Sequence, residues 1–92
     1  MKIGGLEWDD ANLEHIARHA ITPAEVEDVC FGTHIAYHGK HARYVLYGQA
    51  DNGKYIMLVL MHSYGTVLRP ITAREMSESE KHAYRKSIRR TL

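Results

Sequence analysis

The stretch RPITAREMSESE, residues 69–80, predicts a strand that ends just before a helix begins. The strand is expected over residues 66–73, after a turn at Ser63-Tyr64-Gly65. Ser77 and Glu80 then have the three-residue spacing of a helix capping box, with an apolar residue directly before it. The order strand, short connection, helix therefore sets how the C-terminal part of the chain is built.

Upstream of this stretch, the sequence predicts three further strands joined by short turns. They are expected over residues 33–38, 42–48 and 54–62, and Asp51-Asn52-Gly53 is a strong turn signal between the last two. Residues 54–62 are apolar on both faces, which is typical of a strand in the middle of a sheet. Four consecutive strands with tight turns predict an antiparallel meander.

Two helices are expected before the strands. Asp9 or Asp10 is a suitable N-cap for the first of them. The second is expected from Pro23 to Phe31, because Thr22 and Glu25 form a capping box around a proline at the first helical position. Residues 3–8 can form a short first strand. The predicted fold class is α+β, a single domain over residues 1–92 in which two N-terminal helices and one C-terminal helix pack on a four-stranded antiparallel sheet.

Composition favours a soluble, cytoplasmic protein without disulfides. Cys30 is the single cysteine, so no intramolecular disulfide can form, and a reducing compartment is expected. The N-terminus lacks the apolar segment of a signal peptide. The longest apolar run, residues 56–61, is too short to span a bilayer, so no membrane partner is predicted.

Charge is distributed unevenly along the chain, although the net charge is only +1. Residues 1–33 hold two cations and seven carboxylates, whereas residues 69–92 hold seven cations and three carboxylates. A basic end on a nearly neutral chain suits a local contact with a polyanion or an acidic protein. A solvated helix face is the alternative explanation for the last turn.

Arg69 and Arg74 stand where a phosphate site is expected. A strand end is a rigid platform, a helix N-terminus favours anions, and the guanidinium fork matches two phosphate oxygens. The alternative is that both are surface arginines paired with Glu75, Glu78 or Glu80. Strict alternation would place Arg69 and Arg74 on opposite faces. Their cooperation therefore predicts that the strand ends or bulges before Arg74, near residues 73–75.

Seven histidines raise the question of a metal site. His15 and His19 have helical spacing, but the segment between them lacks the glutamate of the zinc-protease motif. Structural or surface histidines are favoured, and neither a metal nor another cofactor is predicted. The sequence also lacks a Gly-x-Ser-x-Gly nucleophile motif and a phosphate-binding glycine loop.

The remaining basic and imidazole side chains suit metal-independent RNA cleavage. In that reaction the 2′-hydroxyl is the nucleophile, a base and an acid move protons, and arginines stabilise the charge on phosphorus. The set contains two histidines, His19 and His82, and histidine suits either proton role. With the resemblance described next, the predicted catalytic residues are His19 for proton transfer and Arg69 and Arg74 for phosphate. The predicted RNA-binding residues are Arg18, Arg43 and Tyr84.

Taken together, these residues resemble the BrnT toxin family over nearly the whole chain. The matching positions are Trp8-Asp9, Asn12, Ile16 to His19, Glu25, Arg43-Tyr44, Gly48, Gly53, Arg69 to Glu75, Glu80 and Tyr84. The resemblance implies a RelE-like fold and the toxin component of a type II toxin-antitoxin system, a ribonuclease that arrests translation. It also implies a BrnA-like ribbon-helix-helix antitoxin, promoter repression by the complex, and a heterotetramer of two toxins and two antitoxins.

One departure from the family pattern concerns the end of the first helix. The family often has Lys-His-Gly where this chain has Arg18-His19-Ala20. Glycine adopts the left-handed conformation without steric cost, whereas alanine there costs roughly 1 kcal/mol. Either the turn differs or the cost is accepted. Two other functions stay open: a non-catalytic interaction module with a basic surface, and a metal hydrolase built on the histidines.

Overall fold

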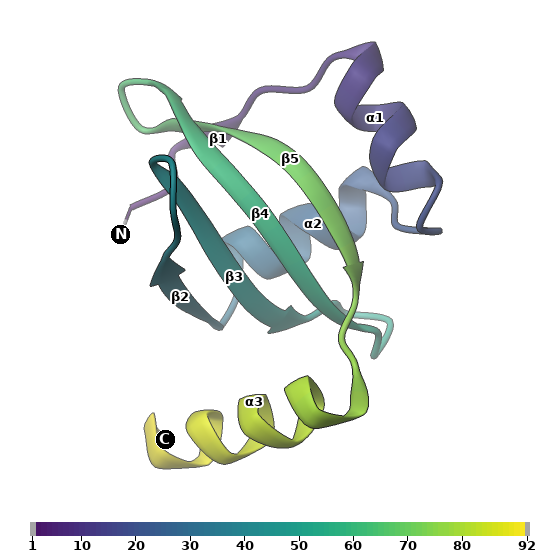
Figure 1. The fold of residues 1–92 in the computed structure, drawn as a ribbon, viewed down its shortest axis with the longest axis vertical. Helices are drawn as coiled ribbons and strands as arrows, with labels where there is room; N and C mark the ends of the chain where they lie inside the picture. Colours follow the sequence, from purple (N-terminus) through teal and green to yellow (C-terminus); the bar gives the residue numbers. More distant parts are fainter. Residues whose placement is uncertain (1, 92) are drawn as a thin grey trace.

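The computed structural model describes residues 2–91 and has an α+β fold with three helices and one five-stranded mixed sheet (Figure 1). Positions 1 and 92 of the predicted domain lie outside the described residues. The elements in chain order are β1 (Gly5–Leu6), α1 (Asp10–Ala17), α2 (Pro23–Phe31), β2 (His34–His38), β3 (Arg43–Gln49), β4 (Tyr55–Tyr64), β5 (Val67–Glu75) and α3 (Glu78–Thr91).

The predicted four-stranded antiparallel sheet is wrong in one respect. Strands β2 to β5 form the expected meander, but β1 adds a fifth strand, parallel to β5, so the order is β1-β5-β4-β3-β2. Without β1, the outer edge of β5 would leave backbone groups unpaired. The N–H groups of Gly4 and Glu7 donate to the carbonyls of Thr66 and Leu68 at 2.8 and 2.9 Å. The short N-terminal strand expected within residues 3–8 is present as Gly5–Leu6.

Local capping signals place the helices where the sequence predicts them. Asp9 caps α1, Thr22 and Glu25 form the capping box of α2, and α2 has the predicted bounds. Ser77 Oγ accepts from the Glu80 N–H at 3.2 Å, and the Glu80 carboxylate accepts from the Ser77 N–H at 2.8 Å. The strands begin and end within two residues of the predicted positions.

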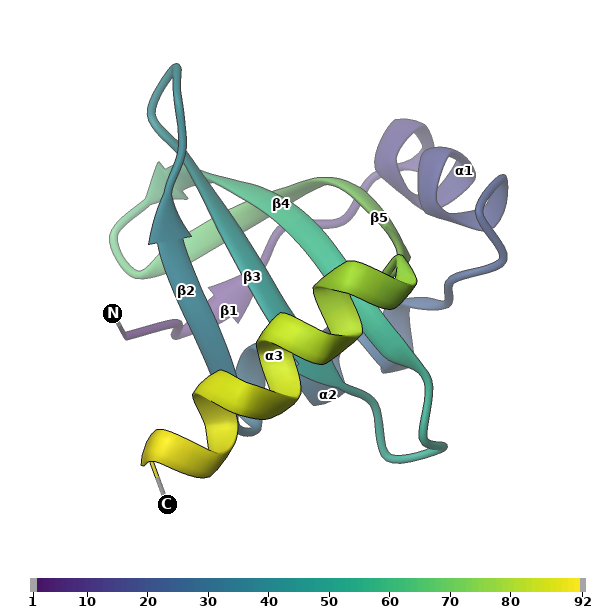
Figure 2. The same cartoon turned by 60° about the horizontal axis from the view of Figure 1, so that its bottom comes forward.

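The two faces of the sheet are covered differently. Helix α2 lies behind the sheet in Figure 1, and α3 crosses in front of it in Figure 2. We call the α2 side the core face, because fully buried apolar side chains from α1, α2 and the strands meet there. They include Ile16, Val26, Val29, Leu46, Ile56, Leu58 and Leu60. Cys30 belongs to this core, and burial raises the pKa of its thiol to about 12.

We call the other side the open face, because α3 covers only part of it. Helix α3 packs against β2, and none of its residues up to Arg90 is buried. The sparse apolar spacing of this helix predicts such light packing. No helix within residues 2–91 is long and apolar enough to cross a membrane.

Strand β5 contains a bulge that decides which face its side chains occupy. Val59 pairs with Thr72 and the next residue, Leu60, pairs with Pro70, so Ile71 is the extra residue on β5. An extra residue reverses the alternation of side chains beyond it. The predicted irregularity near residues 73–75 is therefore found at Ile71 instead, because Ala73 and Arg74 keep regular pairing with β4.

Candidate functional site

Three arginines lie on the open face, and the bulge in β5 is the reason that Arg69 and Arg74 share it. Residues directly opposite each other in a sheet share a face. Arg43 pairs with Met61 and Met61 with Arg69, so both arginines lie in one row across the sheet. Arg74 lies opposite Met57, four residues further back on β4, which is roughly 13 Å along the strand. Without the bulge at Ile71, Arg69 and Arg74 would point to opposite faces.

Asn12 holds the bulged part of β5 in place. Its side chain is 3% exposed. The Asn12 Nδ2 donates to the carbonyls of Pro70 and Glu7, both at 3.0 Å, and its Oδ1 accepts from the Asp9 N–H at 2.9 Å. One buried amide therefore joins the start of α1, the end of β1 and the strand residue beside the bulge.

Arg69 is paired with Asp9, the N-cap residue of α1. Both terminal nitrogens of the guanidinium donate to the Asp9 carboxylate. The Arg69 guanidinium lowers the pKa of the Asp9 carboxyl. Asp9 also accepts from the Asn12 N–H at 3.0 Å. The predicted phosphate-binding side chain is thus oriented by the same group of residues that fixes the bulge.

Arg74 is paired with Glu80 in α3. The two terminal nitrogens of Arg74 donate to the Glu80 carboxylate at 2.7 and 3.0 Å, and the hydroxyl of Tyr47 lies 3.5 Å from that carboxylate. Hydrogen bonds from Arg74 lower the pKa of Glu80 to about 2. Burial and the Glu80 charge raise the pKa of Tyr47. Glu80 also belongs to the capping box of α3. A carboxylate of the protein itself therefore lies beside Arg74, where the sequence predicts a phosphate.

Arg43 differs from the other two arginines. Its Nε is buried and has no hydrogen-bond partner among residues 2–91. Within the same residues it forms no ion pair. A buried donor without an acceptor is costly, at about 1–3 kcal/mol. Of the three arginines, Arg43 is therefore the one whose buried Nε–H lacks a hydrogen-bond acceptor among residues 2–91.

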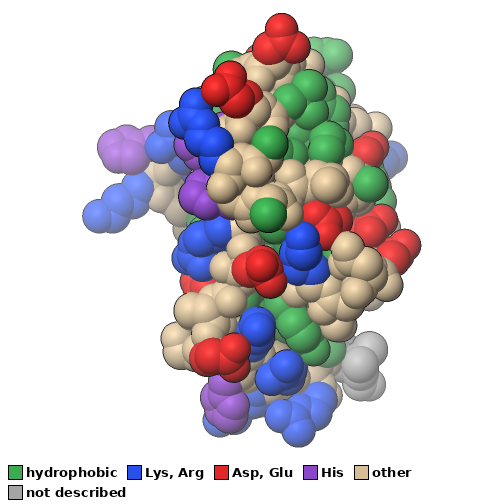
Figure 3. Space-filling model, turned by 90° about the vertical axis from the view of Figure 1, so that its right-hand side faces the viewer, with side chains coloured by type: hydrophobic (Ala, Val, Ile, Leu, Met, Phe, Trp, Pro, Cys, Tyr) green, Lys and Arg blue, Asp and Glu red, His purple; other side chains and the backbone are tan. Residues whose placement is uncertain are grey.

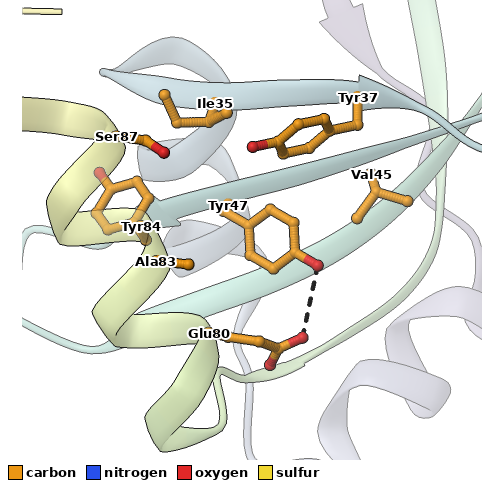
Figure 4. Close-up of a pocket in the computed structure, with 8 residues that line it drawn as sticks. All are labelled: Ile35, Tyr37, Val45, Tyr47, Glu80, Ala83, Tyr84 and Ser87. Carbon is orange, nitrogen blue, oxygen red and sulfur yellow. Dashed lines mark hydrogen bonds between the residues drawn. The ribbon is translucent and has the colours of Figure 1, made fainter. Parts of the chain in front are cut away.

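Tyr84 lies in α3, above the open face, and lines a pocket between this helix and the sheet. The pocket has a volume of about 320 Å³. We call it the tyrosine pocket, and Figure 4 shows its lining: Ile35, Tyr37, Val45, Tyr47, Glu80, Ala83, Tyr84 and Ser87. Burial and the neighbouring Tyr55 raise the pKa of Tyr84. Since Glu80 lines the pocket and binds Arg74, the pocket and this arginine are contiguous.

Arg18 and His19 are not part of this arrangement. Both lie at the end of α1, which sits at the β5 edge of the sheet, away from α3 (Figures 1 and 2). Arg18 pairs with Glu14 in an exposed ion pair of 3.0 Å. The His19 ring is exposed and lies 5.7 Å from that of His15, centroid to centroid. The structure therefore brings Arg43, Arg69, Arg74 and Tyr84 to one side of the molecule, and leaves the predicted proton-transfer residue on another element.

The turn after His19 has a left-handed residue, although that residue is an alanine. Ala20 has a φ of 59°. The Ile21 N–H donates to the Ile16 carbonyl at 3.1 Å, and the Ala20 N–H donates to the Ala17 carbonyl at 3.0 Å. These two hydrogen bonds are those of a Schellman motif, a helix end in which the left-handed residue is usually glycine. The protein therefore bears the steric cost of an alanine in the left-handed conformation.

Figure 3 shows that basic side chains gather at the lower end of the molecule, where α3 lies, while acidic and basic groups alternate over much of the rest. The cations of α3 are Lys81, Arg85, Lys86, Arg89 and Arg90. Arg85 stacks on the Tyr55 ring with its Cζ 4.8 Å from the centroid. The C-terminal charge excess is thus a feature of one helix beside the open face.

Sequence reasoning missed the partner of Arg69, whereas Glu80 was among the expected partners of Arg74. It paired neither Asp9 with Arg69 nor Tyr47 with Glu80, because these residues are far apart in the chain. The sequence did hold a signal for the Asp9 contact, because an acidic N-cap residue, Asp9, and an amide residue, Asn12, follow the first strand. Among residues 2–91, no three His, Cys, Asp or Glu side chains are grouped so that they could hold a metal ion.

Comparisons of the chain with family models, curated proteins and solved structures gave no match. The resemblance to the BrnT family therefore stays a prediction.

Proposed function

We propose that the protein is the toxin component of a type II toxin-antitoxin system, a metal-independent endoribonuclease that cleaves RNA in the cytoplasm and inhibits translation. The observation that supports this most is the arrangement of Arg43, Arg69 and Arg74 on one open sheet face. Cations on a rigid, partly uncovered surface suit a polyanionic strand. The distance of roughly 13 Å between the two rows suggests that Arg69 and Arg74 bind different phosphates of that strand.

The proposed reaction uses the 2′-hydroxyl of the RNA as nucleophile. A base takes its proton, the oxygen attacks phosphorus, and the bond from phosphorus to the 5′-oxygen breaks as an acid protonates that oxygen. Arg69 and Arg74 bind phosphates of the strand, and the arginine at the scissile phosphate stabilises the charge that develops on its oxygens. His19 is the proposed proton-transfer residue, and Arg18, Arg43 and Tyr84 contribute RNA binding. No cofactor takes part in this scheme.

The proposed protein partner is a BrnA-like ribbon-helix-helix antitoxin, with two copies of each chain in the complex. The basic surface of α3 supports an acidic or amphipathic partner segment.

A non-catalytic interaction module is the second candidate function, and one observation favours it. Asp9 and Glu80 already neutralise Arg69 and Arg74. An arginine engaged by an internal carboxylate can serve purely to join α1 or α3 to the sheet.

Cleavage of a labelled, structured RNA in EDTA separates the two candidates. We expect wild-type protein to cleave, and Arg74→Ala to lower kcat/KM about 100-fold, as loss of a charge-stabilising donor does. Arg74→Lys keeps the charge but not the fork, so it recovers only part of the activity. Arg90→Ala, which removes an exposed cation of α3, is the matched control and leaves the rate unchanged. Intact RNA with wild-type protein, or equal rates for Arg74→Ala and Arg90→Ala, would show that the nuclease proposal is wrong.

His19→Ala tests the proton-transfer assignment separately. If His19 moves a proton in the rate-limiting step, its loss removes one limb of the pH–rate profile. His15→Ala, its ring neighbour, is the control. An unchanged profile for His19→Ala would assign proton transfer to another group.

A further inference from the structure

We propose that the tyrosine pocket binds a single nucleobase of the RNA strand whose phosphate lies at Arg74. This inference rests on the proposed function, because it assigns a base-binding subsite to the same open face. The volume of about 320 Å³ is at the small end of the range for small-molecule sites, about 300–1,000 Å³. A pocket of this volume can take a single planar ring.

The aromatic lining favours a flat, unsaturated ligand. Tyr37 on β2 is 53% exposed, and its ring packs edge-on against Tyr47 with centroids 5.9 Å apart and an interplanar angle of 79°. Tyr84 closes the opposite wall from α3, and Figure 4 shows the three rings around the hollow. Aromatic side chains on a sheet are common stacking platforms for bases, since every base has a π-face.

About half of the Tyr37 side chain is exposed to solvent, and its contact with Tyr47 orients the ring. Such a preorganised ring has little to lose in conformational entropy when a base stacks on it. Ile35 and Val45 supply apolar walls beside it. The pocket thus combines an aromatic face with apolar walls.

Polar groups at the rim agree with a nucleotide. The Glu80 carboxylate lines the pocket, and a base N–H can replace the long hydrogen bond of 3.5 Å that Glu80 accepts from the Tyr47 hydroxyl. Arg74 binds Glu80 through its two terminal nitrogens, and its Nε–H makes no hydrogen bond among residues 2–91. Tyr47, Met57 and Arg74 lie in one row, so Tyr47 and Arg74 are roughly 10 Å apart at the backbone. Arg74 can therefore hold the phosphate of a nucleotide whose base enters the pocket.

An apolar side chain from a protein partner is the competing occupant. It would use the walls formed by Ile35 and Val45 but would leave the Glu80 carboxylate and the Arg74 Nε–H without a new partner. A nucleotide uses both the aromatic walls and the charged rim. The observations therefore favour the nucleotide.

The test is a titration of isotope-labelled protein, followed by NMR, with 5′-mononucleotides and with ribose 5-phosphate. Ribose 5-phosphate carries the same phosphate and no base. We expect at least one mononucleotide to bind on the order of tenfold more tightly than ribose 5-phosphate, as base–aromatic stacking predicts. The shifted resonances should include those of Tyr37, Tyr47 and Tyr84.

Three tyrosine variants make the test specific. Tyr37→Ala should remove the tenfold gain, and Tyr37→Phe should keep most of it because the ring remains. Tyr64→Ala removes a tyrosine that is 63% exposed and does not line the pocket, so it should keep the whole gain. Equal effects of Tyr37→Ala and Tyr64→Ala, or no gain from the base in wild-type protein, would overturn the inference.

Two further outcomes show whether the pocket inference or the proposed function has failed. Base-dependent binding without RNA cleavage supports the pocket and contradicts the nuclease. Cleavage without base-dependent binding contradicts the pocket and leaves the nuclease intact. If N-acetyl-leucinamide shifts the pocket resonances and no mononucleotide does, the pocket accepts protein side chains and the inference is wrong.

Discussion

The core face and the open face of the sheet are made by the same strands, yet they differ in composition and packing. On β4, Leu58 points to the core face and is fully buried, whereas its neighbour Val59 points to the open face and is only partly covered. The core face is closed by α2 with aliphatic side chains. The open face carries arginines and tyrosines, with one lightly packed helix over part of it. The core face therefore holds the fold together, and the open face is available for binding.

The largest expected effect comes from truncating the core face. Leu58→Ala should cost about 3 kcal/mol in the free energy of unfolding, because it leaves a cavity at a fully buried site. Val59→Ala, one residue away on the open face, should cost only about 1 kcal/mol. Urea unfolding of both variants measures the difference. Equal losses would contradict the distinction between the two faces.

Acid should weaken the core-face side through Glu25. Burial alone would raise the pKa of Glu25, but hydrogen bonds from Asn52, Thr22 and Lys54 outweigh it and lower the pKa from 4.5 to about 2. A carboxyl with a lower pKa in the folded state stabilises the protein above pH 4.5. That stability, on the order of 3 kcal/mol, is lost as the pH falls from 4.5 to 2.

Glu25→Gln tests this by flattening the dependence of unfolding free energy on pH within that window. Glu27→Gln changes an exposed glutamate of the same helix and should leave the slope as in wild type. Glu80, whose pKa is also about 2, accounts for the acid sensitivity that remains in Glu25→Gln. The same slope in Glu25→Gln and wild type would refute the assignment.

Asn12 supports the bulge through which Arg69 and Arg74 share the open face, and its loss should have an intermediate effect. Asn12→Ala removes the donor to the buried Pro70 carbonyl and should cost about 2 kcal/mol. Amide hydrogen exchange at Ile71 and Thr72 should speed up, because the bulge loses its support. Gln49→Ala, an exposed amide on β3, is the control and should change stability by less than about 0.5 kcal/mol. Unchanged exchange in β5 would mean that Asn12 does not hold the bulge.

The smallest expected effect lies at the end of α1, outside both faces. Ala20→Gly should stabilise the protein by about 1 kcal/mol, because Ala20 has a φ of 59° that glycine adopts without strain. Ala24→Gly, within α2, should instead destabilise by about 0.5–1 kcal/mol. Thermal unfolding compares the two. A lower midpoint for Ala20→Gly would show that the turn tolerates alanine without cost.

The sequence suggested how Arg69 and Arg74 could share a face, but it did not give most of the residues around them. Arg69 and Arg74 lie on one face, as a bulge in β5 was expected to allow, but the bulge is at Ile71 rather than near residues 73–75. Glu80 was among the expected partners of Arg74. The pairing of Arg69 with Asp9 was not expected, since sixty residues separate the two positions.

By itself, the sequence determined the helix starts and the meander. Capping boxes at Asp9, Thr22 and Ser77 depend on groups three residues apart, and tight turns join neighbouring strands, so short-range spacing is enough to predict them. Only the tertiary structure decided the parallel pairing of β1 with β5, the position of the bulge and the tyrosine pocket. Each of these depends on contacts between segments distant in the chain, where the backbone hydrogen bonds and buried amide of one segment satisfy those of another.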